Sequence, residues 1–138
     1  MFFHIHPTNG VPVYEQIARQ IVYAIASGGI VPGELVPSVR NLSRELAVNP
    51  NTVARAYRQL QDSGVLETVR GEGLLVTDKA PDQCQDDRRQ LIAKRIESVL
   101  LEARQSRLSD PEIKSLVESG METSKSLLTQ TVPQENAE

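Results

Sequence analysis

The most constraining feature of this 138-residue sequence is a pair of short helical patterns with almost no chain between them. The first pattern follows Ser38, a residue type that caps helix N-termini. The second follows Asn49 and has Pro50 at its first position, where proline loses no hydrogen bond that the helix needs. Only Ala47, Val48 and Asn49 separate the two patterns. Helices joined so tightly must cross steeply, which predicts a helix-turn-helix.

The second of these helices is predicted to be amphipathic. Its apolar stripe consists of Val53, Ala56, Tyr57 and Leu60. The opposite face displays Asn51, Arg55, Arg58 and Asp62, with Thr52 at its edge. Asn and Arg side chains can bond bidentately to adenine and guanine edges, whereas an aspartate is repelled by phosphate. We therefore expect DNA to meet the first two turns only. A solvated helix face would also be polar, so this face alone favours DNA only slightly.

A predicted hairpin follows directly. Residues 65–69 and 74–77 are β-rich runs that flank the sequence Arg70–Gly71–Glu72–Gly73. The two glycines supply the positive φ angles of a turn and let the backbone approach a partner closely. An arginine at the tip can reach phosphates or the minor groove. A helix-turn-helix with such a hairpin predicts a winged helix-turn-helix, in which one helix lies in the major groove of DNA.

The first 30 residues predict an extended arm and one more helix. The helix begins near Pro12, ends at Gly28–Gly29, and has its apolar stripe at Tyr14, Ile17, Ala18, Ile21 and Ile25. Its other side carries Val22, Tyr23 and Ala26, which we interpret as a contact surface for the C-terminal half. In the arm, His4 and His6 could form a metal pair, but without a third ligand nearby two surface histidines are the favoured interpretation.

Composition limits the classes of protein that this chain can be. The hydrophobic content of 39% supports one aliphatic core, and no apolar run is long enough for a membrane helix. The single cysteine, Cys84, and the lack of a signal-peptide pattern predict a cytoplasmic protein, with a redox switch as the minor alternative. Residues 1–77 carry six arginines against six acids, so two copies are expected to share one DNA site.

Residues 3–77 resemble the GntR family of bacterial transcription regulators. The matching patterns are P-G-x-x-x-P-S-x-R-x-L-S at 32–43, L-x-V-N-P-N-T-V-x-R-A-Y-x-x-L at 46–60 and G-x-L-x-x-x-x-G-x-G at 64–73. The run V-P-V-Y-E-Q-I-x-R-Q-I at 11–21 resembles the YtrA-like subfamily. Leu75 stands where the family usually has an aromatic residue, which alters the packing of the wing and leaves the DNA role intact.

The resemblance implies a set of DNA-binding residues. It assigns DNA contacts to Arg40, Asn49, Asn51, Thr52, Arg70 and Gly71. The helical pattern adds Arg55 and Arg58, and the helix N-terminus adds Ser38 as a phosphate ligand. No catalytic residues, cofactor or metal site are predicted.

The remaining residues predict a helical tail. An amphipathic helix is expected over residues 86–107, and Ser109–Glu112 is a capping signature for another with Ile113, Leu116 and Val117 on one stripe. Two such helices cannot form a core alone, and YtrA-like proteins resemble this arrangement, so residues 78–122 are interpreted as a dimerisation region. Residues 123–138 are polar and are predicted to be disordered.

The fold expected is therefore mainly α with a small hairpin: a winged helix-turn-helix over residues 1–77 and a short helical dimerisation tail. The function expected is sequence-specific DNA binding by a transcription regulator. The finer expectation is a homodimeric repressor that binds an inverted-repeat operator of its own operon, with transporter genes implied by the family resemblance. The alternative is a winged-helix module that binds proteins, and an enzyme ranks third. Whether a small effector binds is left open.

Overall fold

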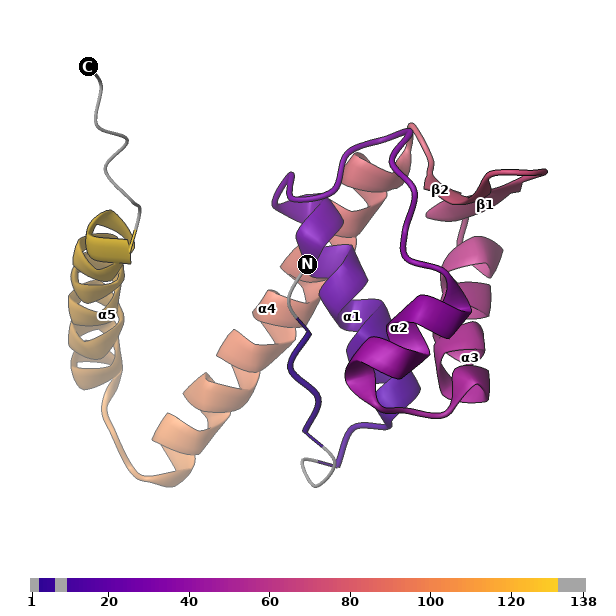
Figure 1. The fold of residues 1–138 in the computed structure, drawn as a ribbon. Helices are drawn as coiled ribbons and strands as arrows, with labels where there is room; N and C mark the ends of the chain where they lie inside the picture. Colours follow the sequence, from indigo (N-terminus) through magenta and orange to yellow (C-terminus); the bar gives the residue numbers. More distant parts are fainter. Residues whose placement is uncertain (1–2, 7–9, 132–138) are drawn as a thin grey trace, which may run out of the picture. The chain divides into compact units, whose positions relative to one another are not determined.

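The computed structural model describes residues 3–6 and 10–131 and divides the chain into two compact units. We call residues 1–92 the N-terminal unit and residues 93–138 the helical unit. Figure 1 shows the order of the elements, which are α1 (Val13–Ala26), α2 (Val39–Leu46), α3 (Pro50–Asp62), β1 (Leu66–Val69), β2 (Gly73–Val76), α4 (Ala80–Gln105) and α5 (Asp110–Thr131). The predicted fold class, a winged helix-turn-helix followed by helices, is confirmed.

The helix-turn-helix is fixed by local caps of the kind that the sequence predicts. The Ser38 hydroxyl oxygen accepts a hydrogen bond from the Asn41 amide at 3.1 Å, and the Asn49 side-chain oxygen accepts one from the Asn51 amide at 2.8 Å. Between the helices Ala47 adopts a left-handed conformation with φ of 54°. This single residue reverses the chain, so that α2 and α3 pack against each other.

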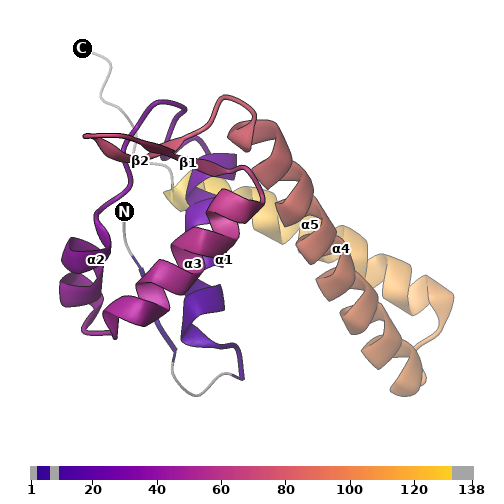
Figure 2. The same ribbon diagram turned by 90° about the vertical axis from the view of Figure 1, so that its right-hand side faces the viewer.

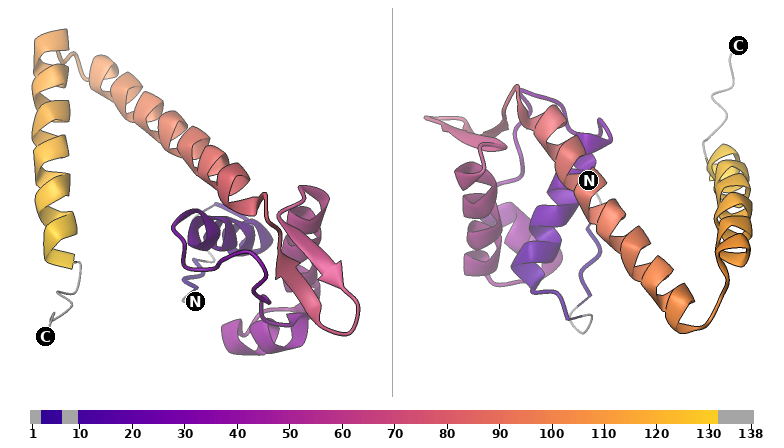
Figure 3. Two further views of the ribbon diagram at one scale, coloured as in Figure 1. Left: turned by 90° about the horizontal axis from the view of Figure 1, so that it is seen from above. Right: turned by 180° about the vertical axis from the view of Figure 1, so that it is seen from behind.

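The hairpin pairs Leu66 with Val76 and Val69 with Gly73 in an antiparallel register. It lies beside the C-terminal part of α3 (Figure 3). A third segment joins it: Leu35 forms a bridge with Leu75. The Val36 amide donates to the Leu74 carbonyl at 3.0 Å, so the base of the wing is tied to the chain that leads into α2.

The core of the N-terminal unit lies between α1, α2, α3 and the hairpin. The predicted stripes are buried: Ile17, Ala18, Ile21 and Ile25 from α1, and Val53, Ala56, Tyr57 and Leu60 from α3. The Tyr57 hydroxyl donates to the Pro37 carbonyl at 2.6 Å and thereby ties α3 to the chain before α2. Among the described residues, no buried side-chain nitrogen or oxygen lacks a hydrogen-bond partner.

An extended arm, residues 3–6, is held along α1 by two glutamine side chains. The Gln20 amide group accepts from the His4 N–H at 2.8 Å and donates to the His4 carbonyl at 2.7 Å. Gln16 makes the same two bonds with the backbone of His6, both at 2.8 Å. Both histidines are exposed. Sequence analysis did not foresee this clasp, although the i, i+4 spacing of the two glutamines is its visible signal.

The sequence predicts that the winged helix-turn-helix ends at residue 77; α4 begins at Ala80, and its first turns belong to the N-terminal unit. Ala80 and Cys84 are both 0% exposed and join the core. Small apolar side chains at i and i+4 let this end of α4 lie close to the other helices. The sequence predicts this helix only from residue 86, because charged residues dominate the stretch and the burial of Ala80 and Cys84 depends on the rest of the fold.

The helical unit consists of the end of α4 and the whole of α5. Ser109 and Glu112 form the predicted capping box: the Glu112 carboxylate accepts from the Ser109 amide at 2.8 Å, and the Ser109 hydroxyl accepts from the Glu112 amide at 3.3 Å. An ion pair at 2.7 Å joins Arg104 to Asp110.

The sequence predicts disorder from residue 123. For residues 123–131 this prediction is wrong, because α5 continues to Thr131. Polar Ser, Lys and Thr residues do not stop a helix when no proline or glycine follows them until Pro133. The rest of the predicted disordered tail, residues 132–138, lies outside the described residues. No helix within the described ranges is both long and apolar enough to cross a membrane.

Candidate nucleic-acid interface

Three segments of the N-terminal unit carry the predicted site residues. They are the start of α2, the first turns of α3 and the tip of the hairpin. Figure 2 shows α2, the adjoining end of α3 and the hairpin tip on one side of the unit. Eight of the nine predicted residues are exposed and Thr52 is half-buried. The full set is Ser38, Arg40, Asn49, Asn51, Thr52, Arg55, Arg58, Arg70 and Gly71.

The start of α2 presents hydrogen-bond donors. The oxygen of Ser38 is engaged as the helix cap, but a hydroxyl that accepts one bond still has its proton to donate. Arg40 follows within the first turn and is exposed. Because the Tyr57 hydroxyl binds the Pro37 carbonyl, the residue before the cap is fixed to α3. The position of Ser38 is therefore tied to α3.

The start of α3 presents amide groups. The Asn49 oxygen caps the helix, which leaves its NH2 group as the free end of that side chain. Asn51 is exposed at the second helical position, so that its oxygen and nitrogen both face solvent. Helix N-termini carry partial positive charge, and this adds a favourable field for phosphate at the starts of α2 and α3.

The arginines differ in how they are held. Among the described residues, Arg40, Arg55, Arg58 and Arg70 have no ion pair, so all four charges are available to an anionic partner. Arg55 alone is anchored: its guanidinium carbon lies 3.8 Å from the centre of the Tyr14 ring on α1. The sequence pattern places Arg55 on the outward face but does not indicate this contact. The contact joins two residues on different helices that are 41 positions apart in the sequence.

The hairpin tip is shaped by glycine. Gly71 has φ of 84° and Gly73 has φ of 124°, in the region that side chains other than glycine rarely adopt. A Cβ atom at Gly71 would meet nothing within 4 Å, so the requirement there is one of backbone conformation. Arg70 is exposed beside it, and so is Glu72. The carboxylate reduces the positive potential at the tip.

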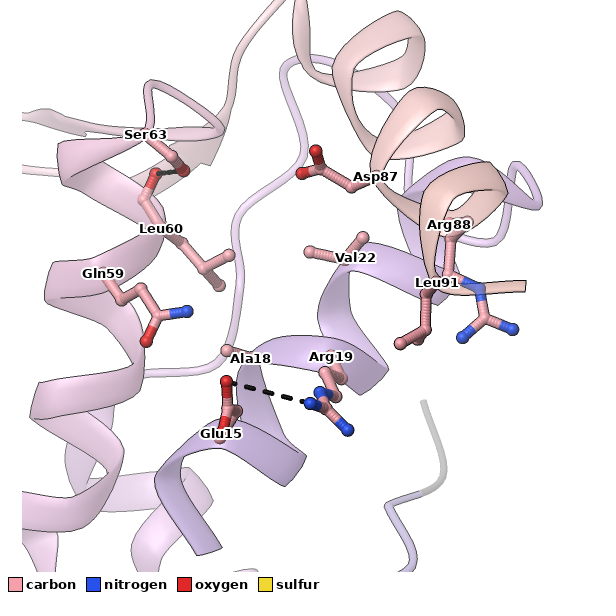
Figure 4. Close-up of a pocket in the computed structure, with 10 residues that line it drawn as sticks. All are labelled: Glu15, Ala18, Arg19, Val22, Gln59, Leu60, Ser63, Asp87, Arg88 and Leu91. Atoms are coloured by element: carbon pink, nitrogen blue, oxygen red, sulfur yellow. Dashed lines mark hydrogen bonds and ion pairs between the residues drawn. The ribbon is translucent and has the colours of Figure 1, made fainter. Parts of the chain in front are cut away.

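A separate groove lies away from these segments, where α1, α3 and the start of α4 meet (Figure 4). Its volume is about 230 Å³, and its apolar lining includes Val22 of α1 and Leu91 of α4 on one side and Leu60 of α3 on the other. Next to it, the Arg88 guanidinium lies 4.8 Å from the centre of the Tyr23 ring. The start of α4 thus contacts the side of α1 that the sequence predicts as a second contact surface, while Tyr23 stays exposed.

Exposed arginine and asparagine side chains at the start of a helix, beside a glycine-tipped hairpin, define a winged helix-turn-helix protein of the DNA-binding class. The comparisons with known proteins agree. The family model described as "Bacterial regulatory proteins, gntR family" matches residues 13–76. The chain is 33% identical to the HTH-type transcriptional repressor YtrA of Bacillus subtilis over 72% of this chain and 76% of that protein. It therefore belongs to the GntR family and is of the YtrA-like type.

Solved structures show the same relationship. A transcriptional regulator from Oenococcus oeni is 27% identical, with a TM-score of 0.73 over 87% of this chain and 99% of that one. YtrA from Sulfolobus acidocaldarius, a GntR-family transcription factor, is 32% identical, with a TM-score of 0.56 over 71% of this chain and 99% of that one. The predicted function, a DNA-binding transcription regulator that is not an enzyme, is thus confirmed at the level of the family.

Proposed function

We propose that the chain acts in the cytoplasm as a homodimeric repressor that binds an inverted-repeat operator in its own operon. We further propose that this operon contains transporter genes. The observation that carries this proposal is the set of exposed donors at the start of α2, the start of α3 and the tip of the hairpin, all in one unit. Similarity to the HTH-type transcriptional repressor YtrA supports the repressor role.

Each segment has a distinct task in this proposal. The first two turns of α3 enter the major groove, where Asn51 and Arg55 bond to base edges. Ser38 and Arg40 bind the phosphate backbone and fix the register of the helix, as phosphate contacts generally do. Arg70 and Gly71 bring the hairpin against the backbone or the minor groove.

The first test separates these tasks. Arg40→Ala is expected to weaken binding to all sequences and to lower the slope of log affinity against log salt by about one. Asn51→Ala is expected to cost roughly 1–3 kcal/mol on the operator and little on random DNA. Titrations of both DNAs at several salt concentrations measure this. If Asn51→Ala lost the same affinity on both DNAs, the proposed recognition face would be wrong.

The dimer is supported by the apolar surface of the helical unit. Of the hydrophobic side chains there, only Ile113 is buried among the described residues. The large exposed ones are Ile96, Val99, Leu101, Leu116, Val117, Met121, Leu127 and Leu128. So large a set of exposed apolar residues is typical of a protein interface. A second copy is the occupant proposed, because a domain with six arginines against six acids in residues 1–77 gains affinity when two copies share one operator.

The second test is the oligomeric state. Val117 and Met121 lie one turn apart on α5, and replacing both by Glu would place two charges in the proposed interface. We expect sedimentation to show an increase of roughly 100-fold in the dimer dissociation constant. Ser115→Glu, on the other side of the same helix, is the matched control and should sediment like the wild type. A wild-type protein that is monomeric at micromolar concentration would overturn the dimer.

A further inference from the structure

We propose that Tyr14 is a positioning residue for Arg55, and that its ring sets how strongly the protein distinguishes its operator from other DNA. The inference rests on the proposed DNA-binding function and deepens it. Tyr14 is not among the predicted site residues, and it lies on α1, which supplies none of them. Its role in recognition would be indirect, through the one arginine of the interface that is held by another side chain.

In this pair the guanidinium group of Arg55 lies over the face of the Tyr14 ring. The guanidinium carbon of Arg55 lies 3.8 Å from the centre of the Tyr14 ring, well within the range of a cation–π interaction. Tyr14 is half-buried and packs against the hydrophobic core in the first turn of α1. Its ring is therefore part of the fixed framework, whereas Arg55 is exposed.

Stacking leaves the bonding groups of Arg55 free. A guanidinium carries its five N–H donors in its plane, so a ring against its face does not occupy them. Within the described part of the chain, Arg55 has no ion pair, and no hydrogen bond is formed by its guanidinium. The donors are thus oriented but unused. This is the state that bidentate recognition of a guanine edge or a phosphate requires.

The benefit of such a stack is preorganisation. A free arginine side chain must lose rotamer freedom when it binds, and that loss weakens the complex. Tyr14 removes part of the loss by restricting Arg55 before DNA arrives. Binding to the correct base uses the oriented donors and therefore gains the full benefit of the smaller entropy loss. Binding to non-specific DNA depends only on positive charge and therefore gains little affinity. The stack should therefore increase discrimination more than it increases general affinity.

The chain offers a matched comparison on the same helix. Tyr23, near the other end of α1, has the Arg88 guanidinium 4.8 Å from its ring centre. That pair joins α1 to α4 and includes none of the predicted DNA-binding residues. If a tyrosine–arginine stack only holds two helices together, removing either ring should have the same kind of effect on DNA binding. If Tyr14 positions a recognition group, only its removal should change discrimination.

The experiment uses the full chain and two duplexes of equal length. One is selected by the wild type from a pool of random sequence, and the other is of unselected sequence. We expect Tyr14→Leu to lower affinity for the selected duplex about fivefold and to leave the other nearly unchanged. Tyr14→Phe keeps the ring and should bind as the wild type does. Tyr23→Leu should leave the ratio of the two affinities unchanged.

Two further variants make the test specific to the pair. In an Arg55→Ala background, Tyr14→Leu should have no additional effect on either duplex, because the positioned group is gone. Arg55→Lys keeps the charge and leaves α1 intact, but it lacks the planar fork. It should lose affinity for the selected duplex alone, and it provides the test if Tyr14→Leu fails to fold.

The possible failures are distinguishable. A wild-type protein that enriches no sequence from the pool would overturn the proposed function, and this inference with it. A wild type that enriches a sequence, combined with a Tyr14→Leu variant of unchanged discrimination, would overturn the positioning role only. The positioning role would also be overturned if Tyr14→Leu lost equal affinity on both duplexes, if its effect persisted in the Arg55→Ala background, or if Arg55→Lys bound as the wild type does.

Discussion

The two units of this chain use apolar residues in opposite ways. In the N-terminal unit, every helix and both strands contribute buried side chains to one core. In the helical unit, α5 buries Ile113 and exposes a row of large apolar residues over the rest of its described length. The N-terminal unit can thus account for its own stability, whereas the helical unit has apolar surface that only another surface can cover.

The polar groups differ in the same way. Gln16, which is 5% exposed, bonds to the backbone of the arm, and the Tyr57 hydroxyl bonds to Pro37. In the helical unit the ion pair of Arg104 with Asp110 is between side chains more than 60% exposed, where such pairs add little stability. The candidate DNA-binding surface is thus built on a well-packed core, while the helical unit keeps most of its apolar side chains exposed among the described residues.

The largest effect that would test this comparison is expected in the core. Ile21 is 0% exposed, and Ile21→Ala should reduce the free energy of unfolding by about 3 kcal/mol, from lost burial and from the cavity left behind. Leu116 is 60% exposed, and Leu116→Ala should change the free energy of unfolding by less than about 0.5 kcal/mol in dilute protein. Urea unfolding followed by tyrosine fluorescence measures the N-terminal unit selectively, because all three tyrosines lie in it.

A Leu116→Ala variant that destabilised the N-terminal unit as much as Ile21→Ala would contradict the division into a self-supporting unit and a dependent one. The measurement should be repeated at higher protein concentration. If the helical unit dimerises, a gain in stability with concentration is expected in the wild type. Leu116→Ala should reduce that gain.

Elements with local signals could be predicted from the sequence. The caps Ser38 and Asn49, the stripe of α3 and the glycines of the hairpin tip each act within a few residues, and all are found where the sequence placed them. The exposure of Asn51, Arg55 and Arg58 followed from the helical periodicity of α3.

Features that depend on contacts between distant segments could not be predicted. The bridge of Leu35 with Leu75 joins segments 40 positions apart in the sequence, and the stack of Arg55 on Tyr14 joins two separate helices. Cys84 lies in a charged stretch, and the composition of that stretch does not predict that Cys84 is buried in the core. The sequence therefore did not indicate that the first turns of α4 join this core, because which side of α4 is covered is decided by the rest of the fold.

The next effect in size concerns the bond that ties α3 to the start of α2. Tyr57→Phe removes the hydroxyl that donates to the Pro37 carbonyl at 2.6 Å and leaves that carbonyl without this partner. We expect a loss of about 1–2 kcal/mol in the free energy of unfolding. Tyr23→Phe is the matched control, because Tyr23 is exposed, and it should unfold like the wild type. Equal stability of the two variants would show that the bond does not contribute to the frame.

The smallest effect is confined to alkaline pH and tests whether the first turns of α4 belong to the frame. Burial raises the pKa of the Cys84 thiol from about 9 to about 11, and the negative charge of Asp87 makes a smaller contribution in the same direction. The unfolded chain therefore releases the thiol proton at a lower pH than the folded one. The stability that this shift represents is complete below pH 9 and is lost as the pH rises towards 11.

Between pH 9 and 10 the wild type should accordingly lose about 1 kcal/mol more than Cys84→Ala, whose alanine cannot titrate. Tyr57, whose pKa is also raised by burial and by Glu45, acts in the same direction but is present in both proteins, so the difference isolates Cys84. A thiol reagent at pH 8 gives an independent measure, since a fully buried sulfur should react far more slowly in the native protein than in urea. Rapid labelling of the native thiol, or parallel pH profiles for the two proteins, would mean that α4 separates from the core in solution, and the N-terminal unit would then end near the hairpin after all.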